Sequence, residues 1–152
     1  MADLNTNNLI LRDFTDNDLE RIAEIENLSI NPPWSYNAIC DFSKCSTSRI
    51  LVADISGNVA GYITYSVVLD EVQRANVAVH PDFRRCGIGE KLLTKLYNDA
   101  KNDNMYIITL EVRQSNIPAI NLYTKCGYSE CGRRKGYYKS PTEDAILMNL
   151  TF

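Results

Sequence analysis

The spacing of apolar residues changes along the chain and predicts which segments fold as strands and which as helices. Residues 8–14 place the apolar Leu9, Ile10 and Leu11 between polar neighbours and predict an edge strand. Thr15 and the acidic residues after it form a helix-start signal, and apolar residues then recur at helical spacing over 19–28. Pro32 and Pro33 end this helix, because proline has no N–H for a helical hydrogen bond.

The rest of the pattern predicts strands first, and alternating helices and strands afterwards. In chain order we expect a helix over 35–42, strands over 49–55, 59–69 and 73–79, a helix over 89–102, a strand over 105–113, a helix over 117–126, and strands over 128–137 and 144–151. Ser56-Gly57-Asn58 joins two strands as a hairpin turn, and Asp70-Glu71 separates the next two. This order predicts an α+β fold, an α/β sandwich built on a mixed sheet.

Length and composition are those of one globular domain spanning residues 1–152. A chain of 152 residues with 45% hydrophobic and 23% charged residues can bury a single core, and it contains no repeat or low-complexity tract. No apolar run approaches the roughly 20 residues that cross a bilayer, and residues 1–8 do not resemble a secretory signal. We therefore expect a cytoplasmic protein without a membrane partner, and we take a monomer as the default.

The charge balance argues against nucleic acid as a partner. The net charge is −3 and the sequence pI is about 5.2, so the surface favours a basic partner over a polyanion. Arg133, Arg134 and Lys135 form a local basic cluster, which we interpret as a solvated loop.

The five cysteines predict free thiols. Their odd number argues against a closed disulfide framework. Cys40 with Cys45, and Cys126 with Cys131, have the C-x4-C spacing of some zinc sites. However, Cys40 and Cys126 fall in predicted helices, and His80, the only histidine, ends a strand. We therefore expect no metal site.

A glycine-rich turn with two arginines stands between a strand that ends at Val79 and a helix that begins at Glu90. The turn reads Arg84-Arg85-Cys86-Gly87-Ile88-Gly89. Such a turn exposes backbone N–H groups at the positive end of the helix dipole, where they suit a pyrophosphate. The arginines add fork-shaped donors. The alternative is an ordinary turn with its arginines in solvent.

A second informative segment reads Leu110-Glu111-Val112-Arg113-Gln114-Ser115-Asn116. Strand alternation sets Glu111 on the face opposite Leu110 and Val112. Taken alone, Glu111 would be an exposed sheet position paired with an arginine or lysine. Asn116 precedes Pro118 and is a helix-capping signal, and Tyr123 lies at core spacing on the helix that follows.

Together these segments resemble the GNAT acetyltransferase superfamily, and most closely its ribosomal-protein-alanine N-acetyltransferase branch, the RimI type. Further matches are Pro33-Trp34-Ser35, Leu122-Tyr123, Gly127-Tyr128, Tyr137-Tyr138 and Glu143-Asp144-Ala145, so the resemblance spans nearly the whole chain. It implies the GNAT fold, a mixed and mostly antiparallel sheet flanked by helices. It also implies acetyl-CoA as cosubstrate and direct transfer without a metal or a nucleophilic cysteine, so that Cys86 is incidental.

The resemblance also assigns roles to individual residues. Glu111 is implied to be the general base that deprotonates an amine, and Tyr123 the general acid that protonates the departing thiolate. Val77, Ala78 and Val79 are implied to lie along the pantetheine, with a backbone N–H for the thioester oxygen. Asn116 would contact the cofactor, although capping accounts for it equally. Glu90 departs from the family pattern, in which a basic or neutral residue is common at this position. An acid that points into the turn would oppose phosphate.

The implied acceptor is the α-amine of a protein that begins with alanine, on a basic ribosomal protein. Asp70-Glu71 and Tyr137-Tyr138 are expected at loops that form the walls of the peptide groove, where acids attract a basic peptide and tyrosines pack along it. Two alternatives are acetylation of a small amine and a non-catalytic subunit that only binds acyl-CoA. Retention of both Glu111 and Tyr123 argues against the second alternative.

Overall fold

A seven-stranded sheet forms the centre of the protein, and the computed structural model describes residues 8–152. The elements are β1 (Leu9–Asp13), a 3-10 turn (Asp16–Asp18), α1 (Leu19–Ser29), α2 (Tyr36–Lys44), β2 (Ser48–Ile55), β3 (Asn58–Val68), β4 (Glu71–Val79), a second 3-10 turn (Pro81–Phe83), α3 (Ile88–Asn102), β5 (Ile107–Arg113), α4 (Ile117–Lys125), β6 (Ser129–Tyr138) and β7 (Glu143–Thr151). All the predicted helices and strands are present. The prediction drawn from residues 1–8 about a secretory signal lies almost wholly outside the described residues.

The strand order is β1-β2-β3-β4-β5-β7-β6, and every neighbouring pair is antiparallel except β4 with β5. The predicted α+β architecture with a mixed, mostly antiparallel sheet is therefore confirmed. Most boundaries differ from the prediction by one or two residues, and one of these differences concerns a predicted site residue. Glu71 is the first residue of β4, paired with Val68 and Ile107, so the bend before β4 consists of Leu69 and Asp70.

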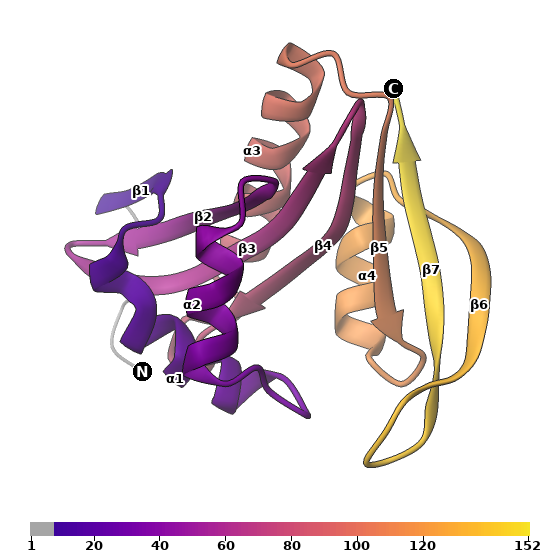
Figure 1. Cartoon of the computed structure of the whole chain (residues 1–152), viewed down its shortest axis with the longest axis horizontal. Helices are drawn as coiled ribbons and strands as arrows, with labels where there is room; N and C mark the ends of the chain where they lie inside the picture. The colour runs from indigo at the N-terminus through magenta and orange to yellow at the C-terminus, as the bar shows by residue number, and fades with distance from the viewer. Residues whose placement is uncertain (1–7) are drawn as a thin grey trace.

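Helices cover both faces of the sheet (Figure 1). α1 and α2 bury one core, which contains Ile22, Ile25, Ile39 and Tyr62. α3 and α4 bury the other, in which Leu92, Leu93, Leu96 and Tyr123 pack against Ile108, Leu110 and Val112 of β5. Alternate residues of β5 thus face α3 and α4, which leaves Glu111 and Arg113 on the side of α1 and α2.

β4 and β5 are paired only at their beginnings. Their register comprises Glu71 with Ile107 and Val72 with Ile108, after which the two strands diverge (Figure 1). Arg74 has a positive φ of 57°, at the irregularity where β4 shifts register against β3. A bulge of this kind bends and twists its strand, and here it turns β4 away from β5. Beyond Val72, both strands therefore present backbone groups that are not used in pairing with each other.

Candidate active site

The turn before α3 presents a row of backbone N–H groups that have no acceptor among the described residues. Gly87 caps α3 with a φ of 77° and Arg85 has a φ of 62°. The first α3 N–H with a described acceptor belongs to Lys91, which donates to the carbonyl of Gly87 at 3.1 Å. Within residues 8–152, the N–H groups from Arg85 to Glu90 donate to no protein acceptor. Such a concave row of N–H groups at a helix N-terminus suits a phosphate or pyrophosphate.

The side chain of Arg84 fixes the position of this turn through hydrogen bonds to β4 and α1. Its Nε donates to the carbonyl of Val79 at 3.2 Å, and its Nη2 donates to Oγ of Ser29 at 3.1 Å. Arg84 thus ties the end of β4 to the end of α1. His80 is buried and accepts the N–H of Asp82 through Nδ1 at 3.1 Å, which fixes the bend out of β4. Of the two arginines, Arg85 is the one whose side chain has no described hydrogen bond to the protein.

The two glycines of the turn have different physical roles. A β-carbon on Gly87 would meet nothing within 4 Å, so only its positive φ demands glycine. A β-carbon on Gly89 would lie 2.9 Å from Cδ2 of Leu122, so Gly89 allows α3 to approach α4 closely. Ile88 is buried in the core. The side chains of Ile88 and Leu122 therefore serve packing, while the turn offers its backbone to the outside.

Glu90 is neutralised by a neighbour. Its Oε2 accepts a hydrogen bond from Nζ of Lys125 on α4 at 2.9 Å, and this contact raises the pKa of Lys125. The acid that departs from the family pattern is therefore paired with a cation. Cys86, in the same turn, donates through Sγ to the carbonyl of Arg84 at 3.5 Å.

Tyr123 lies near the point where β4 and β5 diverge, on the face of the sheet that α3 and α4 cover. Its side chain is buried, and its hydroxyl receives a hydrogen bond from the backbone N–H of Val77 on β4. Burial raises the pKa of Tyr123 to about 12, against the opposing effect of that N–H. Tyr123 stays protonated near neutral pH, so it can donate a proton. Asn116 caps α4, because its side chain accepts the N–H of Ala119 at 3.3 Å, which confirms the predicted cap.

Glu111 lies on the other side of β5. Its Oε1 is 3.4 Å from Nε of Arg134, and 24% of its side chain is exposed. The hydroxyl of Tyr137 forms a hydrogen bond to Glu111, which raises the pKa of Tyr137. The arginine partner offered as the alternative explanation is therefore present. The same contacts also hold the carboxylate in a fixed place while leaving it accessible.

Arg134 is a site residue that sequence reasoning missed. It lies in β6 opposite Ala145 of β7, which itself lies opposite Arg113 of β5, so Arg134 reaches across β7 to Glu111. Its guanidinium also stands 5.9 Å from the ring centroid of Tyr137. Arg134 was interpreted as solvated, and most of its side chain is exposed. Only the order of β5, β7 and β6 in the sheet shows the contact.

The predicted substrate-binding pairs lie at opposite ends of β5. The carbonyl of Asp70 accepts the N–H of Tyr106 at 2.6 Å, and Glu71 stands beside Ile107, where β5 begins. Tyr138 instead lies near Arg113, where β5 ends, with 4.5 Å between the guanidinium carbon and the ring centroid. Six residues of strand separate these ends, or roughly 20 Å. The structure does not bring the two pairs together.

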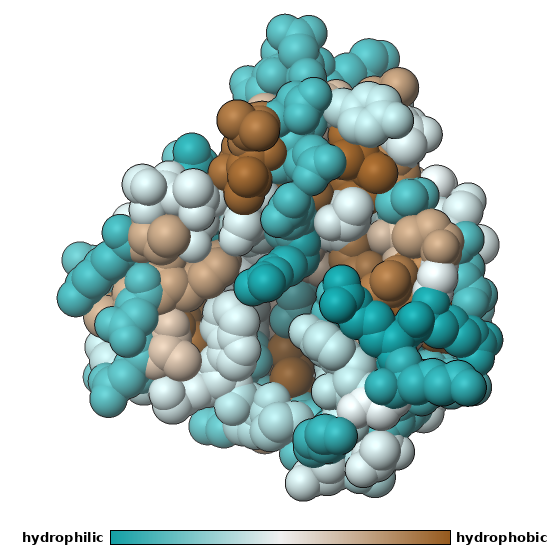
Figure 2. Space-filling view, turned by 45° about the vertical axis from the view of Figure 1, so that its right-hand side comes forward, coloured by the Kyte–Doolittle hydropathy of each residue, from teal (hydrophilic) through white to brown (hydrophobic). Residues whose placement is uncertain are grey.

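Exposed apolar side chains surround the Asp70 end of the sheet. Val68, Leu69 and Tyr106 are exposed there, and Figure 2 shows brown patches toward that end of the molecule. These side chains lie at the end where β4 and β5 still pair, away from Glu111 and Tyr123.

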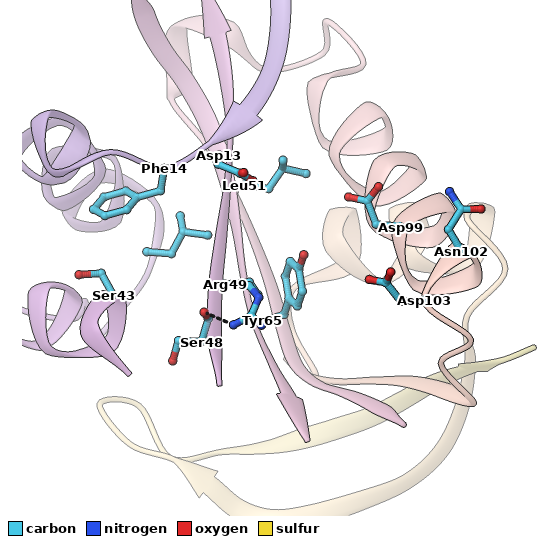
Figure 3. A pocket seen from close by; sticks show the side chains of 11 residues that line it. Asp13, Phe14, Ser43, Ser48, Arg49, Leu51, Tyr65, Asp99, Asn102 and Asp103 are labelled. Carbon is cyan, nitrogen blue, oxygen red and sulfur yellow. Dashed lines mark hydrogen bonds between the residues drawn. The ribbon is translucent and has the colours of Figure 1, made fainter. Parts of the chain in front are cut away.

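A polar pocket of about 490 Å³ lies apart from these residues (Figure 3). Arg49 and Tyr65 line it from β2 and β3, and Asp99 and Asp103 line it from the end of α3. The glycine-rich turn lies at the beginning of α3, so this pocket is at the opposite end of the helix. None of the predicted site residues lines it.

Two further observations concern metals and membranes. Among residues 8–152 there is no group of three or more His, Cys, Asp or Glu side chains arranged to hold a metal, and the five cysteines are free thiols. In the same described range, no helix is long and apolar enough to cross a membrane.

A turn of unpartnered N–H groups suited to pyrophosphate, at the end of a strand that splits from its parallel neighbour, with a buried tyrosine at the split, is the arrangement expected of an acyl-CoA-dependent transferase. The family model described as "Acetyltransferase (GNAT) family" matches residues 14–128. This chain therefore belongs to the GNAT acetyltransferase family, and the fold and family predicted from its sequence are confirmed. The family identifies it as an N-acetyltransferase.

Two similar bacterial proteins share one named activity. The ribosomal protein bS18-alanine N-acetyltransferase of Escherichia coli K12 is 36% identical over 137 residues, covering 88% of this chain and 90% of that protein. The enzyme of the same name from Haemophilus influenzae is 35% identical, covering 86% and 90%. The crystal structure of the ribosomal-protein-S18-alanine N-acetyltransferase from Escherichia coli superposes with a TM-score of 0.87 at 32% identity, covering 94% of this chain and 93% of that one.

We predict that Gly87→Ala weakens acetyl-CoA binding about ten-fold or more, because a strained φ re-aims the N–H groups of the turn. Gly57→Ala is the matched control, since Gly57 has a φ of 89°, a β-carbon added to it would meet nothing within 4 Å, and it lies in the β2–β3 hairpin. Both variants should lose similar thermal stability, but calorimetry should show reduced affinity only for Gly87→Ala. Equal affinities would mean that the turn does not hold the cosubstrate.

Proposed function

We propose that this protein transfers the acetyl group of acetyl-CoA to the α-amine of a protein that begins with alanine, on ribosomal protein bS18 or a close equivalent. The observation that carries the proposal is the placement of Glu111 and Tyr123. They lie on opposite faces of the sheet beside the divergence of β4 and β5, in a chain that is 36% identical to an enzyme named for this reaction.

The described residues fit acetyl-CoA, the cosubstrate of the GNAT family. The unpartnered N–H groups from Arg85 to Glu90 would hold the pyrophosphate, with Arg85 as the adjacent cation. Val77, Ala78 and Val79 would lie along the pantetheine, because this part of β4 has no pairing with β5. The cosubstrate supplies the activated acetyl group as a thioester.

Glu111 would remove protons from the acceptor amine. An α-ammonium group has a pKa of about 8 and is mostly protonated at pH 7, so a base is needed before nitrogen can form a bond to the acetyl carbon. Glu111 is accessible from the side of α1 and α2, and its contacts with Arg134 and Tyr137 fix its position. As the N–C bond forms, the proton lost by nitrogen passes to this carboxylate, directly or through water.

Val77 and Tyr123 would serve the other side of the reaction. The N–H of Val77 is hydrogen-bonded to the Tyr123 hydroxyl, and it would have to turn from that oxygen to the thioester oxygen to stabilise the charge that develops there. When the C–S bond breaks, Tyr123 gives its proton to sulfur and regains one from solvent. The proton acceptor is the thiolate, and because a thiol has a pKa of about 8.5 this transfer from the buried phenol is uphill, so it would be completed as Tyr123 takes a proton from solvent.

The acceptor would enter from the side of α1 and α2, where Tyr137 and Tyr138 adjoin Glu111 and Arg113. Asp70 and Glu71 lie roughly 20 Å from that end of β5, so we assign them no contact with the first residue of the acceptor. A preference for basic peptides would then rest on the net charge of −3, which acts at a distance and is screened by salt.

We predict that Glu111→Gln lowers turnover on an alanine-first peptide by about 100-fold or more at pH 7, the loss expected for a general base. The deficit should shrink at high pH, where the amine is already neutral. Glu130→Gln is the matched control, because Glu130 also pairs with an arginine, Arg133, at 3.0 Å on β6. Acetyl-CoA affinity should be unchanged in both. Full turnover of Glu111→Gln at pH 7 would rule out the assignment.

We predict that wild-type kcat/KM shows no alkaline decline below about pH 10, because the pKa of Tyr123 is raised to about 12 and the acid keeps its proton throughout that range. Steady-state rates from pH 6 to 10 test this expectation. A decline with an apparent pKa near 9 that Tyr123→Phe removes would contradict the raised pKa.

We predict that an alanine-first basic peptide is acetylated with a higher kcat/KM than either an acidic peptide with the same first residue or spermidine. Added salt should reduce the difference between the two peptides. Mass spectrometry of the products gives the modified atom. A clear preference for spermidine would favour the small-amine alternative, and tight acetyl-CoA binding without transfer to any acceptor would favour the non-catalytic one.

A further inference from the structure

Arg113 lies two residues beyond Glu111 on the same face of β5, and only 16% of its side chain is exposed. We propose that Arg113 is a positioning residue, which fastens the α1–α2 loop to the β6–β7 hairpin and so sets the acceptor-binding surface beside Glu111. The inference deepens the proposed function and rests on it. Three of the residues that Arg113 contacts, Asn31, Lys139 and Pro141, lie outside the helices and strands, and the fourth, Glu143, is the first residue of β7.

One guanidinium joins the two segments by hydrogen bonds. Nη2 of Arg113 donates to the carbonyl of Asn31 in the α1–α2 loop at 2.8 Å and to the carbonyl of Lys139 at 2.9 Å. Nη1 donates to the carbonyl of Pro141 at 3.2 Å and to Oε1 of Glu143 at 3.1 Å. The contacts therefore extend from the end of β5 to both segments at once.

The shape of the contact requires arginine. A planar fork can address carbonyls from different directions, whereas a lysine ammonium is a single point charge. Tyr138 packs on the guanidinium with its ring centroid 4.5 Å from the guanidinium carbon. Glu143 balances the charge, and its other oxygen accepts the N–H of Ser115. Hydrogen bonding from Ser115, chiefly from its side chain, together with Arg113 holds the pKa of Glu143 below its usual range. Both Nη atoms of Arg113 and one face of its guanidinium are thus held by the chain.

A second tie joins the same two segments without Arg113. Nδ2 of Asn31 donates to the carbonyl of Ser140 at 2.9 Å. On the other side of the loop, the N–H of Trp34 donates to Oε1 of the buried Glu26 at 3.2 Å. The α1–α2 loop is therefore fixed to α1 at Trp34 and to the hairpin at Asn31. Removal of the Asn31 side chain cuts one tie and leaves the four Arg113 contacts in place.

Loss of Arg113 should affect acceptor binding more than chemistry. The carbonyls of Asn31, Lys139 and Pro141 would lose the Arg113 donor and would be hydrogen-bonded by water instead. The two segments would then be less ordered in the free protein, and ordering them when the acceptor binds would cost free energy. Glu111 keeps its own partners, Arg134 and Tyr137, which do not depend on Arg113. KM for the acceptor should therefore rise while kcat changes little.

The experiment compares Arg113→Gln, Arg113→Lys and Asn31→Ala with the control Arg133→Gln, which removes an exposed hairpin arginine paired only with Glu130 among the described contacts. We expect KM for the alanine-first peptide to rise about ten-fold or more in Arg113→Gln, with kcat within about three-fold of wild type. Arg113→Lys should not restore KM, and Asn31→Ala should raise it less. Calorimetric acetyl-CoA affinity should be unchanged in all of them.

Hydrogen exchange of the free protein supplies a readout that does not depend on activity. Amides in 30–35 and in 138–143 should exchange faster together in Arg113→Gln and, to a smaller extent, in Asn31→Ala, and not in the control. A wild-type KM in Arg113→Gln, a loss confined to kcat, or faster exchange in only one segment would overturn the proposal. If Arg113→Gln fails to fold, Asn31→Ala decides by the same criteria.

The two proposals fail in different ways. If wild-type protein acetylates no peptide, the proposed function is wrong, and the exchange measurements still judge whether Arg113 couples the two segments. If peptides are acetylated normally but exchange and KM do not respond to Arg113 or Asn31, only the positioning role is wrong.

Discussion

The early end of pairing between β4 and β5 is the constraint on which the rest of the molecule depends. Hydrogen bonding between these parallel strands stops after Val72 and Ile108, and the bulge at Arg74 turns β4 away. Both strands are nevertheless held firmly, β4 by β3 and β5 by β7, so the split is rigid. Because the sheet is open between β4 and β5, side chains from both faces of the sheet can reach this opening.

Glu111 and Tyr123 use the two faces of this opening differently. Tyr123 is buried among α4, α3 and the sheet, and burial keeps it protonated. Glu111 remains partly exposed among Arg134 and Tyr137. The proposed mechanism needs both environments, because its acid, Tyr123, must be kept neutral and its base, Glu111, must be reachable by a solvated amine. Placing them on opposite sides of one sheet allows the two environments to be set independently.

Most of the cations near the site are engaged with the protein itself. Arg84 binds the end of β4 and α1, Lys125 neutralises Glu90, and Arg113 joins two loops. The turn that would face pyrophosphate therefore relies chiefly on backbone N–H groups and the α3 dipole. Backbone donors have no side-chain freedom to lose when an anion binds, so such a turn is already organised for its ligand.

The sequence by itself determined the order of helices and strands, the glycine-rich turn and the residue types at the centre of the site. Helical and strand periods are local, and so are the signals at Asn116 and Gly87, which is why neighbouring residues reveal them. It did not reveal that Arg134 reaches Glu111 across β7, that Gly89 is small because of Leu122, or that Asp70 lies at the far end of β5. Those facts depend on strand order and helix packing, which bring together residues distant in the chain. Arg113 shows the division most clearly: its place after Glu111 is written in the sequence, but its partners at Asn31 and Lys139 exist only once the sheet has set two loops side by side.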